Sequence, residues 1–164
     1  MKYILVMIIG ALIACSGSRQ DRMKTLMGDS LNGLYQVKEI NGHQFRLTYL
    51  PEKEKGQEEW CFKLNVEVSP ETKASKGESQ QASYGLDTLF ALVAGADTLL
   101  PAHTMRIANG NLKGIEYMII FEKKKWQVEN VKFCFSDWLF THRFIEFPVQ
   151  LPAINKIDSI SSRI

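Results

Sequence analysis

The sequence contains few of the residues and motifs that mark catalytic or cofactor-binding sites. Of its 164 residues, three are histidines and three are cysteines. It has no Cys-x-x-Cys pair, no glycine-rich phosphate loop and no Walker pattern. The formal net charge of +2 gives no electrostatic reason for nucleic-acid binding. We therefore expect a protein without enzyme activity, without a cofactor and without a nucleic-acid partner.

The sequence also lacks an apolar run long enough to span a bilayer as a helix, which takes about 20 residues. A shorter apolar stretch, Tyr3 to Leu12, follows the single basic residue Lys2. This arrangement is typical of a cleaved export signal. The stretch ends in Leu12-Ile13-Ala14-Cys15, which resembles the bacterial lipobox. A plain secretory signal and a short membrane helix are the alternatives.

The lipobox resemblance implies that residues 1–14 are a cleaved signal peptide and that Cys15 is the first mature residue. Cys15 would carry diacylglycerol on its sulfur and an acyl chain, such as palmitate, on its amine. Several acyl chains anchor a protein to a membrane more firmly than one. Residues 15–33 would then form a lipidated tether. By the resemblance to other lipoproteins, Ser16 is compatible with sorting to the outer membrane. The tether contains Arg19 and a single acidic residue, Asp21, which favours a domain that faces the periplasm.

Residues 34–148 have the pattern of short β-strands separated by turns. Apolar and polar residues alternate along Leu34 to Ile40 and along His43 to Leu50, and Asn41-Gly42 between them predicts a tight hairpin. Further strands are expected over 60–68, 86–93, 98–100, 115–121, 126–135 and 138–147. Seven or eight such strands predict a mainly β protein, an antiparallel β-sandwich.

The order of segments is also loosely similar to that of small immunoglobulin-like lipoproteins of the Bacteroidota envelope. The similarity is carried by Tyr49-Leu50-Pro51, by Asp97 to Pro101 and by the apolar strand Tyr117 to Phe121. It implies an immunoglobulin-like sandwich and names no function. Elsewhere, only Asp21 to Met27 is expected to be helical, residues 69–83 are expected to form a long exposed loop, and residues 149–164 an irregular tail, with an edge strand as the alternative.

Two cysteines remain if Cys15 is lipidated. In Trp60 to Val68 and in Val131 to Ser136, alternation puts Cys61 and Cys134 on the polar faces of their strands. In an oxidising compartment they could form a disulfide, as a surface staple between neighbouring strands.

Aromatic residues give a second candidate site. Trp60, Trp126 and Trp138 could line a groove for a glycan or a peptide, because aromatic rings stack on apolar ligand faces. Phe133, Phe135, Phe140 and Phe144 are expected in the core. The run Lys123-Lys124-Lys125 is interpreted as a solvated turn.

The segment Gly28-Asp29-Ser30-Leu31 resembles the nucleophile block of GDSL esterases, but no strand precedes it and no Asp-x-x-His follows late in the chain. Asp29 and Ser30 are better explained as turn or cap residues. His43, His103 and His142 are isolated from one another, so no metal site is expected.

These observations lead to one function with two alternatives. The chain is expected to be a non-catalytic, lipid-anchored lipoprotein of the outer membrane that holds an envelope protein partner. A glycan- or peptide-binding lipoprotein module is the alternative, and a GDSL-like esterase is the minor one.

Overall fold

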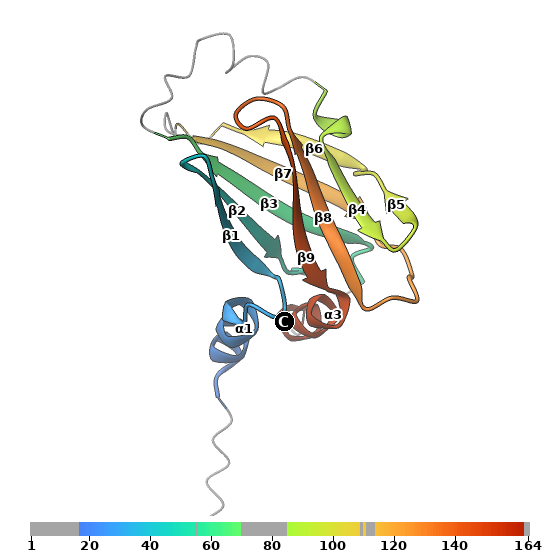
Figure 1. Cartoon of the computed structure of the whole chain (residues 1–164). Helices are drawn as coiled ribbons and strands as arrows, with labels where there is room; N and C mark the ends of the chain where they lie inside the picture. The colour runs from blue at the N-terminus through green and yellow to red at the C-terminus, as the bar shows by residue number, and fades with distance from the viewer. Residues whose placement is uncertain (1–16, 55, 70–84, 109, 111–113, 163–164) are drawn as a thin grey trace, which may run out of the picture.

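The computed structural model describes residues 17–162 except 55, 70–84, 109 and 111–113. The described chain is mainly β, with a helix near each end (Figure 1). Its elements, in chain order, are α1 (Arg19–Gly28), β1 (Tyr35–Ile40), β2 (His43–Leu50), β3 (Glu59–Glu67), the short 3-10 helix η1 (Leu86–Thr88), β4 (Phe90–Ala94), β5 (Asp97–Leu99), β6 (His103–Ile107), β7 (Gly114–Glu122), β8 (Asn130–Asp137), β9 (Arg143–Gln150) and α3 (Leu151–Ser161). The predicted signal peptide, Cys15 and nearly all of the predicted loop lie outside the described residues.

The nine strands form two antiparallel sheets, which confirms the predicted β-sandwich. One sheet has the order β1-β2-β3-β7-β6 and the other β5-β4-β8-β9. In an immunoglobulin domain the third strand lies in the sheet opposite the first two. Here the first three strands are neighbours in one sheet, so the strand order differs from the immunoglobulin order.

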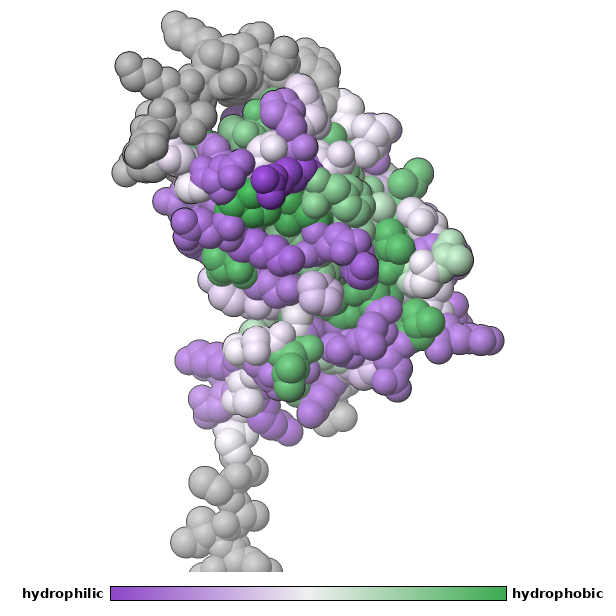
Figure 2. All heavy atoms as spheres, viewed as in Figure 1, coloured by the Kyte–Doolittle hydropathy of each residue, from purple (hydrophilic) through white to green (hydrophobic). Residues whose placement is uncertain are grey.

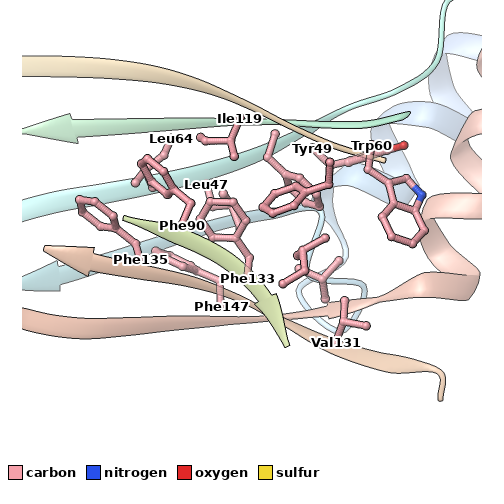
Figure 3. Close-up of a cluster of buried hydrophobic side chains, with 14 of the residues drawn as sticks. Leu47, Tyr49, Trp60, Leu64, Phe90, Ile119, Val131, Phe133, Phe135 and Phe147 are labelled. Atoms are coloured by element: carbon pink, nitrogen blue, oxygen red, sulfur yellow. The ribbon is translucent and has the colours of Figure 1, made fainter. Parts of the chain in front are cut away.

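The core lies between the two sheets and is rich in phenylalanine. Along β2 and β7 every second residue is buried, as expected for strands with one face against a core. Phe133 of β8 lies near the centre, with its ring centroid 5.3 Å from that of Phe62 and 5.9 Å from that of Phe90 (Figure 3). Each fully buried side chain of this kind contributes about 1.5–3 kcal/mol through burial.

Local sequence signals located most strands correctly. The exceptions are strand β6, which was missed, and Phe144, which was placed on the wrong face of its strand. Asn41 and Gly42 have φ values of 53° and 76°, the left-handed conformation that a two-residue hairpin turn requires. Strand β6 was not predicted, because an edge strand without a single buried residue lacks apolar alternation. Phe144 was predicted in the core but is 63% exposed. Strand β9 begins after a turn, at Arg143, so Ile145 and Phe147 face inward and Phe144 faces out.

Both chain ends of the described part are helical. The predicted helix over 21–27 is confirmed as α1, which Ser18 and Asp21 cap reciprocally. The predicted irregular tail is wrong, because residues 151–161 form helix α3. Pro152 does not prevent this, since proline is tolerated in the first turn of a helix. The helix covers one end of the sandwich and buries Leu151, Ala153, Ile154, Ile157 and Asp158.

The edges of β1 and β9 are tied together by side chains. Gln36 of β1 donates to the Pro148 carbonyl at 2.9 Å, and Lys38 donates to the Glu146 carbonyl. Gly33 makes a close approach just before β1, because a Cβ there would lie 2.1 Å from the Pro148 oxygen. This side of the sandwich is therefore closed to further strands. No helix in the described part of the chain has the length and apolarity to span a membrane.

Candidate ligand groove at the helical end of the sandwich

Two of the three predicted tryptophans meet at the end of the sandwich that carries α3. Trp60 is the second residue of β3, and Trp126 lies in the connection between β7 and β8. Their rings stack with centroids 5.5 Å apart and an interplanar angle of 28°. Trp138 follows β8 at the opposite end (Figure 1). The predicted three-tryptophan groove is therefore not assembled, but a two-tryptophan stack is.

The ring of Trp126 is held in place by polar contacts. Its Nε1–H donates to Oδ2 of Asp97 at 2.8 Å, and the Lys124 ammonium lies 2.5 Å from the same oxygen. The hydrogen bonds from Lys124 and then from Trp126 lower the pKa of Asp97 below its ordinary value. The Asp97 carboxylate therefore stays ionised. From the start of β5 it holds the Trp126 indole through this hydrogen bond.

A groove of about 640 Å³ runs beside this stack, between the connection that follows β7 and the first turns of α3. Small-molecule sites fall in a range of roughly 300–1,000 Å³. Its walls combine aromatic, aliphatic and polar side chains: Glu58, Trp60, Lys123, Lys124, Lys125, Trp126, Val128, Glu129, Leu151, Pro152 and Asn155. The groove thus has the size and the mixed lining of a binding site for a small ligand.

The Trp60 side chain has an unusual feature for a buried residue. It is only 4% exposed, yet its indole N–H has no hydrogen-bond partner in the described part of the chain. In Figure 3 the indole nitrogen points toward the helical end of the fold. A buried donor without an acceptor costs about 1–3 kcal/mol.

A buried polar cluster fastens α3 beside the groove. Asp158 accepts hydrogen bonds from the Tyr49 hydroxyl at 2.9 Å and from the Glu52 backbone N–H at 3.1 Å. The Lys123 ammonium pairs with the Glu52 carboxylate and lies 3.4 Å from Asp158. Burial raises the pKa of Asp158, although these donors oppose the shift. Burial and the Asp158 charge also raise the pKa of Tyr49, which remains a neutral donor.

The possible disulfide between Cys61 and Cys134 is not formed, since both are free thiols. Cys61 lies on β3 in one sheet and Cys134 on β8 in the other, so the two strands are not neighbours. Cys61 alternates with buried residues along β3, as predicted, whereas Cys134 is itself buried between Phe133 and Phe135 and is not on an exposed polar face. Packed sheets lie about 10 Å apart, beyond the Cα separation of about 7 Å that a disulfide tolerates.

The other sequence candidates do not come together either. Ser30 lies in an exposed turn after α1, and Asp29 is the C-cap of that helix, as expected for cap and turn residues. His142 lies in the β8–β9 connection at the far end. His43 is buried and accepts a hydrogen bond from the Ser69 N–H at Nδ1. The described residues contain no cluster suited to a metal ion.

Asp97 and Asp158 are the residues of this region that sequence reasoning missed. Asp97 was noted only as the first residue of the segment Asp97 to Pro101, and Asp158 lay in the tail that was predicted to be irregular. The spacing of Leu151, Ile154 and Ile157 is helical and is a signal that could have identified α3 and so the setting of Asp158. No protein-family model, curated protein or solved structure matches the chain.

Proposed function

We propose that this protein is a non-catalytic lipoprotein of the outer membrane, anchored through Cys15, whose sandwich holds a partner protein at the periplasmic face. The lipobox Leu12 to Cys15 supports the anchor. Helix α1 begins at Arg19, four residues after Cys15. An extended chain spans at most about 3.6 Å per residue, so the first turn of α1 would stay within about 14 Å of the acylated cysteine. The helical end would then face the membrane.

The observation that carries the partner-binding part is an apolar patch on the outer face of the five-stranded sheet. Leu50, Cys61 and Ile120 are neighbours across β2, β3 and β7, and Met118 and Met105 are neighbours across β7 and β6. These five residues, here called the outer patch, are half-buried except Met105, which is 47% exposed. A solvated face of an antiparallel sheet is normally polar. Contiguous apolar surface of this kind marks interaction sites.

The opposite outer face, seen in Figure 2, has polar side chains at its centre. There Lys132 of β8 pairs with Glu146 of β9 at 3.1 Å, between scattered apolar side chains. The outer patch also borders an ion pair, Lys63 with Glu116 at 2.9 Å, and what favours it as the docking surface is its unbroken run of apolar neighbours. Its two methionines are flexible and polarisable, and adapt to the shape of an apolar partner. Because β6 ends the sheet, a partner strand could also pair with its edge.

The test introduces a photo-crosslinking amino acid at Met105 in cells that express the tagged full chain. Thr98, an exposed residue on the other sheet, serves as the matched control position. We expect a discrete envelope protein attached at position 105 and not at position 98. The adduct should be lost when Met118→Glu is added, because a charge in the patch opposes apolar docking.

Three outcomes would contradict the proposal. Adducts of equal yield at positions 98 and 105 would indicate non-specific contact. An adduct unchanged by Met118→Glu would exclude the patch, and a product containing only a second copy of this chain would indicate self-association. The anchor is tested separately: wild type should partition into membranes with acyl chains detectable by mass spectrometry on Cys15, and Cys15→Ser should not.

A further inference from the structure

We propose that the groove beside Trp60 and Trp126 binds a neutral saccharide, as a free oligosaccharide or as the sugar headgroup of a lipid. This inference is independent of the outer patch and of the partner proposed above. It rests on three properties of the groove: a rigid aromatic surface, a rim of hydrogen-bonding side chains, and the balance of charge.

The aromatic surface is rigid before any ligand arrives. Trp126 stacks on the buried Trp60, and its indole N–H donates a hydrogen bond to Asp97. These two contacts hold the Trp126 ring in one orientation. Trp126 is half-buried and lines the groove together with Val128, which is 41% exposed. Tryptophan offers a large contact area that loses little conformational entropy on binding. The apolar C–H face of a pyranose ring is a suitable partner for such a surface.

The rim supplies donors and acceptors of the kind that sugar hydroxyls require. Glu58 and Glu129 offer carboxylate acceptors, Asn155 offers both an amide donor and an acceptor, and Lys125 offers an ammonium donor. A hydroxyl group both donates and accepts, so it can be satisfied by each of these groups.

The charges favour a neutral sugar over an acidic one. The basic run next to the groove is largely neutralised, because Lys123 pairs with Glu52 and Asp158 and Lys124 pairs with Asp97. The carboxylates of Glu58 and Glu129 also line the groove, with Lys125 as the remaining cation of the run. An anionic ligand would meet these two acids at close range, and like charges repel.

The experiment measures binding of cellotetraose, maltotetraose and tetra-N-acetylchitotetraose, all uncharged, to the full chain by titration calorimetry. The protein is kept in a detergent without a sugar headgroup. Tetragalacturonate tests an acidic sugar, and tetra-alanine tests a peptide. We expect at least one neutral tetrasaccharide to bind with a Kd tighter than about 1 mM. Vesicles that carry the same sugar on a lipid distinguish a glycolipid headgroup from a free oligosaccharide.

Variants assign the binding to the groove. Trp126→Ala should weaken it at least about tenfold, equivalent to about 1.4 kcal/mol, and Trp126→Phe should restore part of it. Asn155→Ala and Glu129→Gln change exposed side chains of the rim and should weaken binding without unfolding the protein, as checked by circular dichroism. Trp138→Ala, an exposed tryptophan at the far end, is the matched control and should change the Kd less than about twofold.

The inference is overturned if no neutral tetrasaccharide binds at that level, or if Trp126→Ala and the rim variants bind as the wild type does. Tighter binding of tetragalacturonate or of tetra-alanine would overturn the neutral-saccharide assignment as well. The groove does not include Met105, so the crosslinking test is independent of these measurements. A failure of the saccharide proposal can therefore be distinguished from a failure of the proposed partner site.

Discussion

Asp158 illustrates how a single buried side chain can position a whole helix. Its carboxylate joins α3 to Tyr49 at the end of β2, to the backbone of Glu52 and to Lys123. Asp158 is 5% exposed, and the loss of hydration on burial outweighs the opposing effects of Tyr49 and Lys123, so the pKa of Asp158 is raised. The protonated form is therefore favoured more strongly in the folded chain than in the unfolded chain.

This shift predicts the pH dependence of stability. A carboxyl group with a raised pKa in the folded state contributes stability that is fully present below its unfolded pKa of about 3.9 and is lost as pH rises through the folded value. Asp158→Asn removes the titrating group but keeps an acceptor oxygen. We expect the stability of the wild type relative to Asp158→Asn to be highest near pH 4 and to fall toward pH 7. Urea unfolding of both proteins across this range measures the difference, and an increase with pH would contradict the assignment.

At the scale of elements, α3 closes the end of the sandwich that the strands leave open. Its apolar residues insert between the two sheets, and Ile154 is completely buried. The same helix forms one wall of the groove through Leu151, Pro152 and Asn155. Ile154 thus packs in the core and Asn155 lies in the groove wall, while Leu151 contributes to both.

Substitution on each face separates these roles. Ile154→Ala should lower the free energy of unfolding by about 2–5 kcal/mol, because it leaves a cavity in the core. Asn155→Ala, one residue further along but exposed, should change it by less than about 0.5 kcal/mol. Denaturant unfolding followed by circular dichroism measures both. Similar losses for the two variants would mean that α3 does not pack as described.

At the scale of the whole molecule, the distribution of strands between the two sheets keeps Cys61 and Cys134 apart as free thiols. Cys61 is half-buried on the outer face of one sheet, and Cys134 is 1% exposed on the other. Burial, with a smaller contribution from Glu146, raises the pKa of Cys134 to about 11. Burial also raises the pKa of Cys61. Few thiolates are therefore present at neutral pH, and the buried one is also shielded from reagents.

We expect both thiols to stay reduced after purification in air. Iodoacetamide should label Cys61 in the native protein several-fold faster than Cys134, which should react fully only after denaturation. A reducing agent should leave the melting temperature unchanged. Peptide mapping by mass spectrometry measures the labelling, and recovery of a Cys61–Cys134 disulfide peptide would contradict the sheet arrangement.

Sequence alone was sufficient to predict secondary structure where the preference is encoded within a few neighbouring residues. The alternation from His43 to Leu50, the Asn41-Gly42 turn and the helical segment Asp21 to Met27 each depend on local backbone and side-chain geometry. The lipobox is local in the same sense, and its consequence for Cys15 stays a prediction. These signals determined the β class of the domain, its antiparallel hairpin and its first helix.

Only the tertiary structure decided which of these elements are neighbours. Hydrophobic burial is non-directional, so alternation shows that β3 and β8 each have an inward face but not that they belong to different sheets. For this reason the sequence left open whether Cys61 and Cys134 pair. It also did not show that Trp126 lies beside Trp60 while Trp138 lies at the far end. Helix α3 likewise depends on burial against the sandwich. The sequence carries its helical apolar spacing, but not the surface against which that face packs.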